Sequence, residues 1–266
     1  MNLKHSFYIY FLLLIFLHPI KGNAQNNIGA FGSGEWLKYK LRYGFINAGY
    51  TTLEVKDTLY LGKTNFLIDG RGWTTGVTKL FYKVEDSYQS IVDKKTLYPY
   101  FSKRRVDEGG YKILHDVYFN QFKGSALVID YKRNTEKSFD VVKGVQDMIS
   151  SMYFVRNTDF ANFKIGQEIT VDLFYDNQLN NFKLRFLGRE IINTKFGKIR
   201  TLKFKPFVES GRVFKDQNSV VVWVTDDDNK IPIKIKADLM VGSINAELEY
   251  FKGLLDRKST RLNSSH

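Results

Sequence analysis

The sequence predicts a mostly β protein, an antiparallel open barrel, half-barrel or sandwich with one amphipathic helix packed on it. First, apolar and polar residues alternate along many short segments, which is the spacing of strands with one buried face. Second, turn-forming residues separate these segments at short intervals. Third, one stretch carries its apolar residues at a helical period instead.

The alternation begins at Trp36 and recurs along most of the chain. It is clearest in residues 37–43, 169–175, 182–186 and 231–235. Because strands of parallel sheets are apolar on both faces, this alternation favours antiparallel pairing. Turns are expected between these runs, and their residues are 47–49, 61–63, 108–110, 123–125, 196–198 and 228–230.

One segment near the middle of the chain breaks the strand pattern. Its apolar residues fall at i, i+3, i+4, i+7 and i+8, and they are Val145, Met148, Ile149, Met152 and Tyr153. A second short helical or irregular piece is expected at residues 77–82. A single helix among strands buries its apolar stripe against the sheet, so we expect the first helix to cover or plug an open sheet.

Residues 1–24 have the pattern of a cleavable secretory signal. Lys4 gives a positive start, and residues 7–17 form an apolar run too short to span a bilayer. The small residues Gly22 and Ala24 then occupy the −3 and −1 positions of the expected cleavage site. The alternative is an uncleaved N-terminal anchor. Because the chain contains no cysteine, a lipoprotein anchor and disulfides are excluded, and we expect a periplasmic protein with no membrane anchor after cleavage.

The last residues of the chain, 256–266, read DRKSTRLNSSH and match the in-frame translation of a common sequencing-library adapter. The alternative is a genuine polar tail. Residues 25–255 are then expected to form one β domain, because no linker, repeat or low-complexity stretch divides them. The formal charge of +12 falls when both ends are removed, since Lys4 and Lys21 leave with the signal and the tail is net positive.

The chain lacks the signatures of catalytic and metal sites. Of its four histidines only His115 lies within residues 25–255, so a zinc site of several histidines or cysteines is excluded. Alternation puts His115 on the face of Ile113 and Val117, which favours a histidine of the core or rim. No nucleophile elbow, phosphate loop or dinucleotide fingerprint occurs. We therefore expect no catalytic residue, no metal and no cofactor, and a protein that is not an enzyme.

Clustered carboxylates have a simpler explanation than chemistry. Residues 226–228 (Asp-Asp-Asp) lack the ligand spacing of a calcium loop and fall between two strand patterns, so we interpret them as a hairpin turn. The pairs at 107–108 and 247–249 suit glycosidase chemistry only if two carboxylates face one another, and nothing in the sequence places them so.

Aromatic residues make up 15% of the chain and have two interpretations. The first is a sheet core, since strands favour aromatic residues. The second is an apolar groove in a partly closed barrel, capped by the predicted helix, because methionine adapts to irregular apolar ligands and barrel mouths hold ligands. The residues expected at this groove are Trp73, Phe81, Tyr82, Met148 and Met152.

The basic excess does not indicate a nucleic-acid partner. Export argues against one, and residues 103–105 form a short basic cluster rather than a recognition helix. Other lysines are expected on a solvated sheet face, and they are Lys203, Lys205, Lys234 and Lys236. The alternative is that they attract anionic lipid headgroups at an envelope surface.

Several motifs occur in a characteristic order. The first are residues 34–39 (GEWLKY), 44–49 (GFINAG) and 147–156 (DMISSMYFVR). The later ones are residues 196–198 (FGK), 223–228 (WVTDDD), 231–235 (IPIKI) and 241–244 (VGSI). Together they resemble the bacterial exported proteins grouped as domain of unknown function 3108, over nearly all of residues 32–253. The resemblance implies a Gram-negative envelope location and a mostly antiparallel β fold; it implies no established reaction and supplies no catalytic residues.

Three functions remain in question. The leading hypothesis is a non-enzymatic periplasmic domain that binds an apolar or amphipathic envelope molecule in a sheet-lined groove. The alternative is an envelope scaffolding or protein-interaction domain with no small ligand, and an enzyme acting on cell-wall glycans is third. A continuous cavity under the helix favours the first, a filled core with an exposed apolar patch favours the second, and two convergent carboxylates in a cleft favour the third.

Overall fold

The computed structural model describes residues 29–208, 220–238 and 242–255. The expected secretory signal (1–24) and adapter-derived tail (256–266) lie outside the described residues. Within the described ranges, fourteen strands form a single sheet, accompanied by the helices α2 (Gly76–Phe81) and α3 (Met148–Arg156).

The strands follow the chain in two groups. The first group is β1 (Trp36–Tyr43), β2 (Ile46–Tyr60), β3 (Lys63–Thr74), β4 (Glu85–Val92), β5 (Pro99–Glu108), β6 (Tyr111–Asn120), β7 (Ser125–Asp130) and β8 (Thr135–Asp140). The second group is β9 (Glu168–Tyr175), β10 (Gln178–Thr194), β11 (Gly197–Val208), β12 (Val220–Thr225), β13 (Pro232–Asp238) and β14 (Ser243–Lys252).

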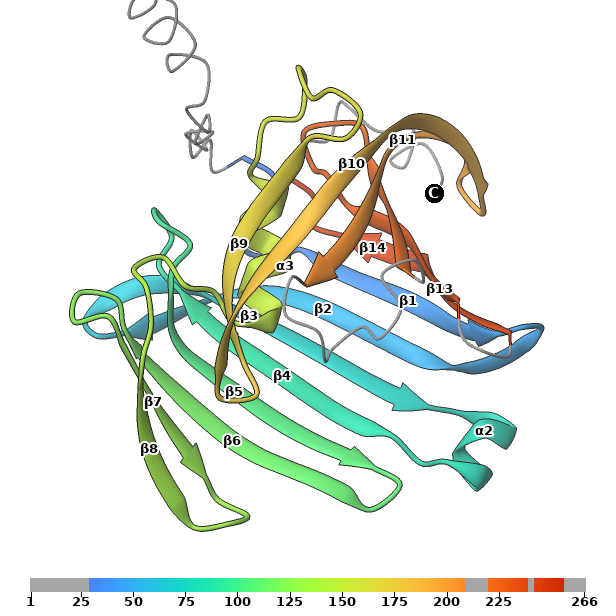
Figure 1. The fold of residues 1–266 in the computed structure, drawn as a ribbon. Helices are drawn as coiled ribbons and strands as arrows, with labels where there is room; N and C mark the ends of the chain where they lie inside the picture. Colours follow the sequence, from blue (N-terminus) through green and yellow to red (C-terminus); the bar gives the residue numbers. More distant parts are fainter. Residues whose placement is uncertain (1–28, 209–219, 239–241, 256–266) are drawn as a thin grey trace, which may run out of the picture.

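Each group is a meander, and the two meanders join where β1 pairs with β14 (Figure 1). Across this seam Trp36 is opposite Lys252 and Tyr43 is opposite Ile244. All strand neighbours are antiparallel, and the sheet ends at β8 on one side and β9 on the other, so it is not closed into a barrel. The predicted antiparallel, open β fold with a packed helix is therefore confirmed.

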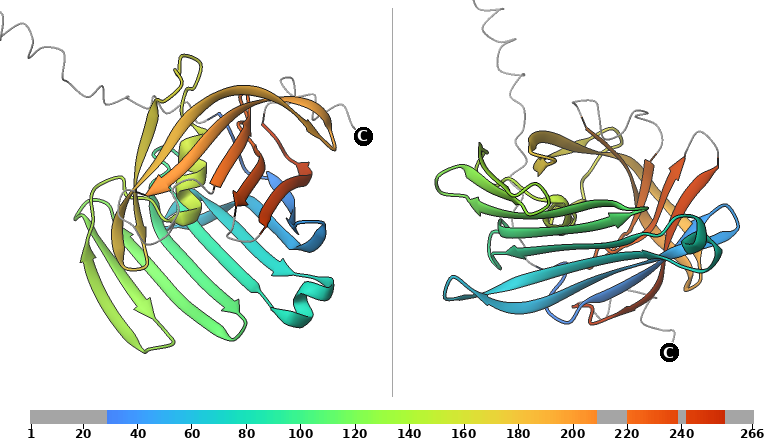
Figure 2. Two further views of the ribbon diagram at one scale, coloured as in Figure 1. Left: turned by 45° about the vertical axis from the view of Figure 1, so that its right-hand side comes forward. Right: turned by 90° about the horizontal axis from the view of Figure 1, so that it is seen from below.

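The second meander curls back over the seam. A bulge between Phe186 and Gly188 interrupts the pairing of β10 with β11, and Gly188 has a φ of +127°. Bulges bend a strand and increase its twist. The far end of the β10–β11 hairpin consequently arches over β13 and β14 (Figure 2), where the Phe196 ring lies 5.4 Å from the Phe251 ring.

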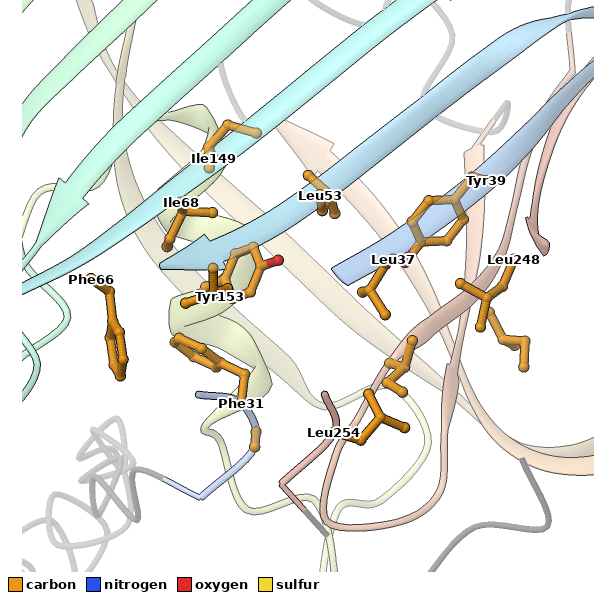
Figure 3. Close-up of a cluster of buried hydrophobic side chains, with 14 of the residues drawn as sticks. Phe31, Leu37, Tyr39, Leu53, Phe66, Ile68, Ile149, Tyr153, Leu248 and Leu254 are labelled. Atoms are coloured by element: carbon orange, nitrogen blue, oxygen red, sulfur yellow. The ribbon is translucent and has the colours of Figure 1, made fainter. Parts of the chain in front are cut away.

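Helix α3 lies between the two meanders and takes part in the cores of both. Ile149 and Tyr153 are buried in the larger core with residues of β1, β2, β3 and β14 (Figure 3). Val155 is buried in a second core with Val171, Leu184 and other residues of β9–β12. One short helix therefore fills the space that the open sheet leaves between its halves.

The sequence places α3 correctly, but its first turn begins later than the apolar stripe. The stripe starts at Val145, whereas α3 starts at Met148, because the backbone of Gln146 is extended and pairs with β9. The amide of Gln146 donates to the Asp172 carbonyl (2.8 Å), and its carbonyl accepts from the amide of Phe174 (2.8 Å). These two hydrogen bonds cover the exposed edge of the end strand β9.

The short helix expected at residues 77–82 is confirmed by α2, which spans Gly76–Phe81.

The acidic run at residues 226–228 lies in the connection between β12 and β13, as the interpretation of a turn requires. The Asp227 carboxylate accepts hydrogen bonds from the Thr225 hydroxyl (2.7 Å) and from the amide of Lys230 (3.0 Å). These are the local bonds for which aspartate is favoured in turns. Among the described residues no group of three or more potential metal-binding side chains comes together.

Candidate functional site

Helix α3 is fixed to the inner face of the first meander by its N-cap. The Asp147 carboxylate accepts from the amides of Ile149 (2.9 Å) and Ser150 (3.0 Å), and from the hydroxyl of Ser90 on β4 (2.5 Å). Burial raises the pKa of this carboxyl group, while the hydrogen bonds oppose the rise. On β3, Gly70 has no side chain where the Ile149 side chain packs, because a Cβ there would lie 2.8 Å from Cδ1 of Ile149.

A buried ion pair fixes the other end of α3. The Arg156 guanidinium donates to both carboxylate oxygens of Glu35, each at 2.7 Å. It also donates to the carbonyls of Ala30 (3.0 Å) and Asn229 (2.9 Å). Burial disfavours the guanidinium charge, but the Glu35 carboxylate more than offsets this and holds the pKa of Arg156 above its usual value. The pair joins the helix to the segment before β1 and to the β12–β13 connection.

Two tyrosine hydroxyls lie in the same buried region. Tyr39 and Tyr153 are 3% and 1% exposed, and the Glu35 carboxylate lies close enough to act on both hydroxyls. Burial raises the pKa of both phenols above the usual value. Two neutral phenols lie beside an ion pair whose hydrogen-bonding groups already have partners. The cluster therefore has the properties of a polar core rather than of a reactive centre.

A small chamber with both polar and apolar lining residues lies where α3 begins. Arg104 on β5 reaches the β9–β10 turn, where its guanidinium is 2.5 Å from the Asp176 carboxylate and donates to the Tyr175 hydroxyl (2.8 Å). Met148 and His115 also line this chamber, whose volume is about 50 Å³. That volume holds one or a few water molecules, whereas ligand pockets span about 300–1,000 Å³. The chamber at the start of α3 is therefore smaller than a typical ligand pocket.

A larger opening, which we call the basic cleft, lies where the β10–β11 hairpin arches over β1, β13 and β14. Its volume is about 330 Å³. Its apolar lining residues are Ile192, Ile233 and Leu248. Its charged lining residues are Lys40, Arg42, Lys195, Lys234, Glu247 and Glu249.

The charges of the basic cleft do not balance. Lys234 lies 3.1 Å from the Glu247 carboxylate, and the Glu249 carboxylate is paired with Lys38 at 3.2 Å. Lys40 and Arg42, by contrast, make no ion pair with any residue that the structure describes. Lys40 and Arg42 therefore line the cleft without an ion pair, although Lys40 is opposite Glu247 in the β1–β14 register.

The carboxylates considered in the sequence do not form an acid–base pair. Glu247 and Glu249 are each bound to a lysine, and Asp107 lies 3.6 Å from Lys112. A pair that the sequence does not reveal is Asp86 with Glu108, on neighbouring strands β4 and β5. Burial and the Glu108 carboxylate raise the pKa of Asp86 to about 6. Strand pairing brings these two groups together, and neither lines the chamber or the cleft.

The five residues expected to line an apolar groove lie in separate places. Met148 lines the small chamber at the start of α3, and Met152 packs against the larger core. Trp73 lies on the opposite face of β3 from Gly70 and α3, since side chains alternate along a strand, and its ring is 6.1 Å from that of Tyr50. Phe81 and Tyr82 are exposed at the far end of the sheet, 85% and 52% respectively. Ligand binding by these residues stays a prediction.

His115 has the partly buried position that its alternation predicts. Its side chain is 15% exposed, and Nε2 lies 3.2 Å from the Asp130 carboxylate. Arg133 contacts the same carboxylate at 3.2 Å. His115 and Arg133 therefore share the Asp130 carboxylate, and no serine hydroxyl is among the partners of the histidine.

The fold and the cleft define a class of protein: an open antiparallel sheet with a packed helix and a cleft at the seam between β1 and β14. The chain belongs to the family described as "Protein of unknown function (DUF3108)", whose model matches residues 38–249. None of the curated proteins matches it.

One solved structure supports the fold. A β-barrel-like protein of the domain of unknown function DUF1849 from Brucella abortus superposes with a TM-score of 0.56 at 10% identity, covering 82% of this chain and 96% of that one. An exported protein with a YmcC-like fold from Bacteroides fragilis gives 0.35 at 10% identity, covering 84% and 98%. A protein described as a lipoprotein from Parabacteroides distasonis gives 0.34 at 13% identity, covering 85% and 98%. The last two scores are too low to carry an argument, and no catalytic family is indicated.

Proposed function

We propose that this protein binds an anionic amphipathic molecule in the basic cleft. The main observation behind the proposal is that Lys40 and Arg42, which make no ion pair, line a space of about 330 Å³ together with apolar residues. An anionic head group would accept charge-assisted hydrogen bonds from Lys40 and Arg42. An acyl or similar apolar portion would pack against the partly buried Ile192, above Ile233 and Leu248, which are only 2% and 3% exposed.

The cleft has the size of a small-ligand pocket, whereas the chamber at the start of α3 is several times smaller. The site proposed here lies at the β1–β14 seam, whereas the site expected from the sequence includes the methionines of α3. An exported, periplasmic location, as expected from residues 1–24, would expose the cleft to the anionic amphiphiles of a Gram-negative envelope. Neither helix in the described part of the chain meets the length and hydropathy needed to cross a membrane.

The test is a calorimetric titration of the protein with dodecyl phosphate, an anionic single-chain amphiphile. The concentration of dodecyl phosphate is kept below its critical micelle concentration. The variant Lys40→Gln/Arg42→Gln should bind at least about tenfold more weakly, because each lost charged hydrogen bond contributes about 1.5–3 kcal/mol. The variant Ile192→Asn should also weaken dodecyl phosphate, while leaving the weak binding of inorganic phosphate unchanged.

The matched control is Lys63→Gln/Lys123→Gln. It removes the same charge from two exposed positions outside the cleft, the first residue of β3 and the β6–β7 turn. If this control weakens binding as much as the cleft variant does, the attraction is to net charge alone and the assignment of the cleft is wrong. Equal binding of dodecyl phosphate and uncharged dodecyl maltoside would also contradict the proposal.

A further inference from the structure

The far part of the β10–β11 hairpin lies beyond the strands on either side of it. Strand β9 pairs with β10 only as far as Arg185, and β12 pairs with β11 only from Thr201 onward. We call residues 191–200 the ribbon, because in the described structure these two lengths of strand pair only with each other (Figure 2). A two-stranded ribbon without further neighbours is marginally stable by itself, so its position depends on what it rests on.

The base of the ribbon is fixed to the rest of the protein. The carbonyl of Arg200 accepts a hydrogen bond from the amide of Asp226 (3.0 Å). The hydroxyl of the buried Thr201 donates to the carbonyl of Glu190 (2.9 Å). These contacts hold both strands in place up to the base, and a movement of the ribbon can pivot where the contacts end.

The tip of the ribbon rests on β14 through side chains. The Lys195 ammonium donates to the Glu249 carbonyl, and the Phe196 ring meets the Phe251 ring edge to face, with centroids 5.4 Å apart. Among the described residues, no backbone hydrogen bond joins the ribbon to β14. The tip can therefore separate from β14 without breaking the sheet.

The ribbon covers the apolar side of the basic cleft. Ile192 of the ribbon lines the cleft together with Ile233 and Leu248, and these three residues pack in one buried cluster that also contains Ile199. Ile233 and Leu248 are almost fully buried, so an apolar chain reaches them only when the ribbon lifts. Arg42, by contrast, is exposed to solvent. With the ribbon in place, the cleft thus presents its charges and covers its apolar side.

We propose that the ribbon is a hinged cover of the basic cleft, and that the apolar portion of the ligand enters when the tip leaves β14. This inference rests on the proposed function, to which it adds the route of entry. The anionic head group binds first at Lys40 and Arg42, and the ribbon then lifts and closes again over the apolar portion. Without ligand the closed state prevails, because opening exposes Ile199 and Phe196 to water.

Opening can be measured without any ligand, because the chain has no cysteine of its own. Ile199→Cys and Leu53→Cys each place a single thiol in the larger core, at positions that are both 7% exposed. The ribbon thiol should react with an aromatic disulfide reagent at least about tenfold faster than the thiol on β2, because local opening of the ribbon exposes it. Equal reaction rates would show that the ribbon does not open, and the proposal would be wrong.

The contact at the tip should control this opening. Adding Phe196→Ser to Ile199→Cys should raise the reaction rate at least about threefold further, because the ribbon loses its contact with Phe251. The matched control is Phe122→Ser, which removes a 99% exposed phenylalanine from the β6–β7 turn and should leave the rate unchanged. Equal rates with both serine variants would contradict control by the tip. All rates are measured well below the thermal unfolding of each variant, so that global unfolding does not contribute.

A covalent lock tests the route of the ligand. In Phe196→Cys/Phe251→Cys the two thiols are joined by a short bis-maleimide, which holds the ribbon closed. The comparison protein is the same variant with both thiols capped by N-ethylmaleimide. Stopped-flow association with dodecyl phosphate should be at least about tenfold slower for the locked protein, because the cover cannot lift. The weak binding of inorganic phosphate should be the same in both proteins, because the site of the head group stays open.

The proposed function and the cover fail in different ways. If neither the wild-type protein nor the capped protein binds dodecyl phosphate, the proposed function is wrong, and the thiol reaction rates alone decide whether the ribbon opens. If the capped protein binds and the locked protein associates equally fast, the cleft holds the ligand but the ribbon is not its cover.

Discussion

Replacement of Arg156 by methionine should cost a large share of the stability of this protein. The change removes the guanidinium that donates to Glu35, Ala30 and Asn229, and it leaves the fully buried Glu35 carboxylate without a cation. Breaking a buried pair in this way costs about 3–5 kcal/mol. Because the free energy of unfolding of a domain is about 5–15 kcal/mol, Arg156→Met should be strongly destabilised.

Urea denaturation measures this loss of stability, with tryptophan fluorescence as the signal. Trp36 is adjacent to Glu35 in the chain, so its fluorescence reports on the region of the ion pair. The double variant Glu35→Leu/Arg156→Met should lose less stability than the sum of the two single changes, because no charge is then left buried alone. A surface control is Arg185→Met, whose partner Glu168 lies 2.7 Å away in an exposed pair, and it should cost less than about 1 kcal/mol. Additive single changes, or a cost of less than about 1 kcal/mol for Arg156→Met, would refute the reasoning.

Three further outcomes are expected from stability measurements. Asp147→Ala should cost about 1–2 kcal/mol because α3 loses its N-cap, while Asp147→Asn should cost less; equal losses in urea denaturation would contradict the capping role. Because burial and Glu108 raise the pKa of Asp86 to about 6, above its unfolded value, the stability contributed by this group is present at low pH and is lost as pH rises through 6. Asp86→Asn should therefore flatten the change in unfolding free energy between about pH 4 and pH 7, and an unchanged slope would argue against this titration. Gly253→Ala should be far more destabilising than Gly62→Ala in thermal unfolding, because both have positive φ but a Cβ at 253 would lie 2.0 Å from a carbonyl oxygen; similar losses would show that conformation alone decides.

The elements were predictable because each is encoded locally. Alternation along β1, β9 and β13 depends only on which side of a strand is buried, and the spacing of Met148, Ile149 and Met152 depends only on the helical period. The start of α3 was predicted early because Val145 fits the helical stripe, whereas its buried side chain belongs to a core with β6 and β7. An apolar residue has the same sequence signal in either environment.

The site was less predictable because it depends on contacts between distant strands. Lys40 and Arg42 look like the polar half of an ordinary alternating strand, and only the arch of β10 over β1 makes them line a cleft. Glu35 and Arg156 are far apart in sequence, and nothing local marks either as buried. The bulge at Gly188 bends β10 into that arch, and the alternation of apolar residues along the sequence does not reveal it.

The seam between β1 and β14 has a consequence for the way the chain folds. Every other strand pairs with a strand adjacent in sequence, so nearly the whole ladder forms from local contacts. Because β14 is last in chain order, β1 has only one partner until the rest of the described chain has been made. A circular permutant joined at the seam and cut between β8 and β9 would be a simple meander in which all neighbours are consecutive. Since folding rates fall with the mean sequence separation of contacts, that permutant should fold faster than the natural order while forming the same sheet.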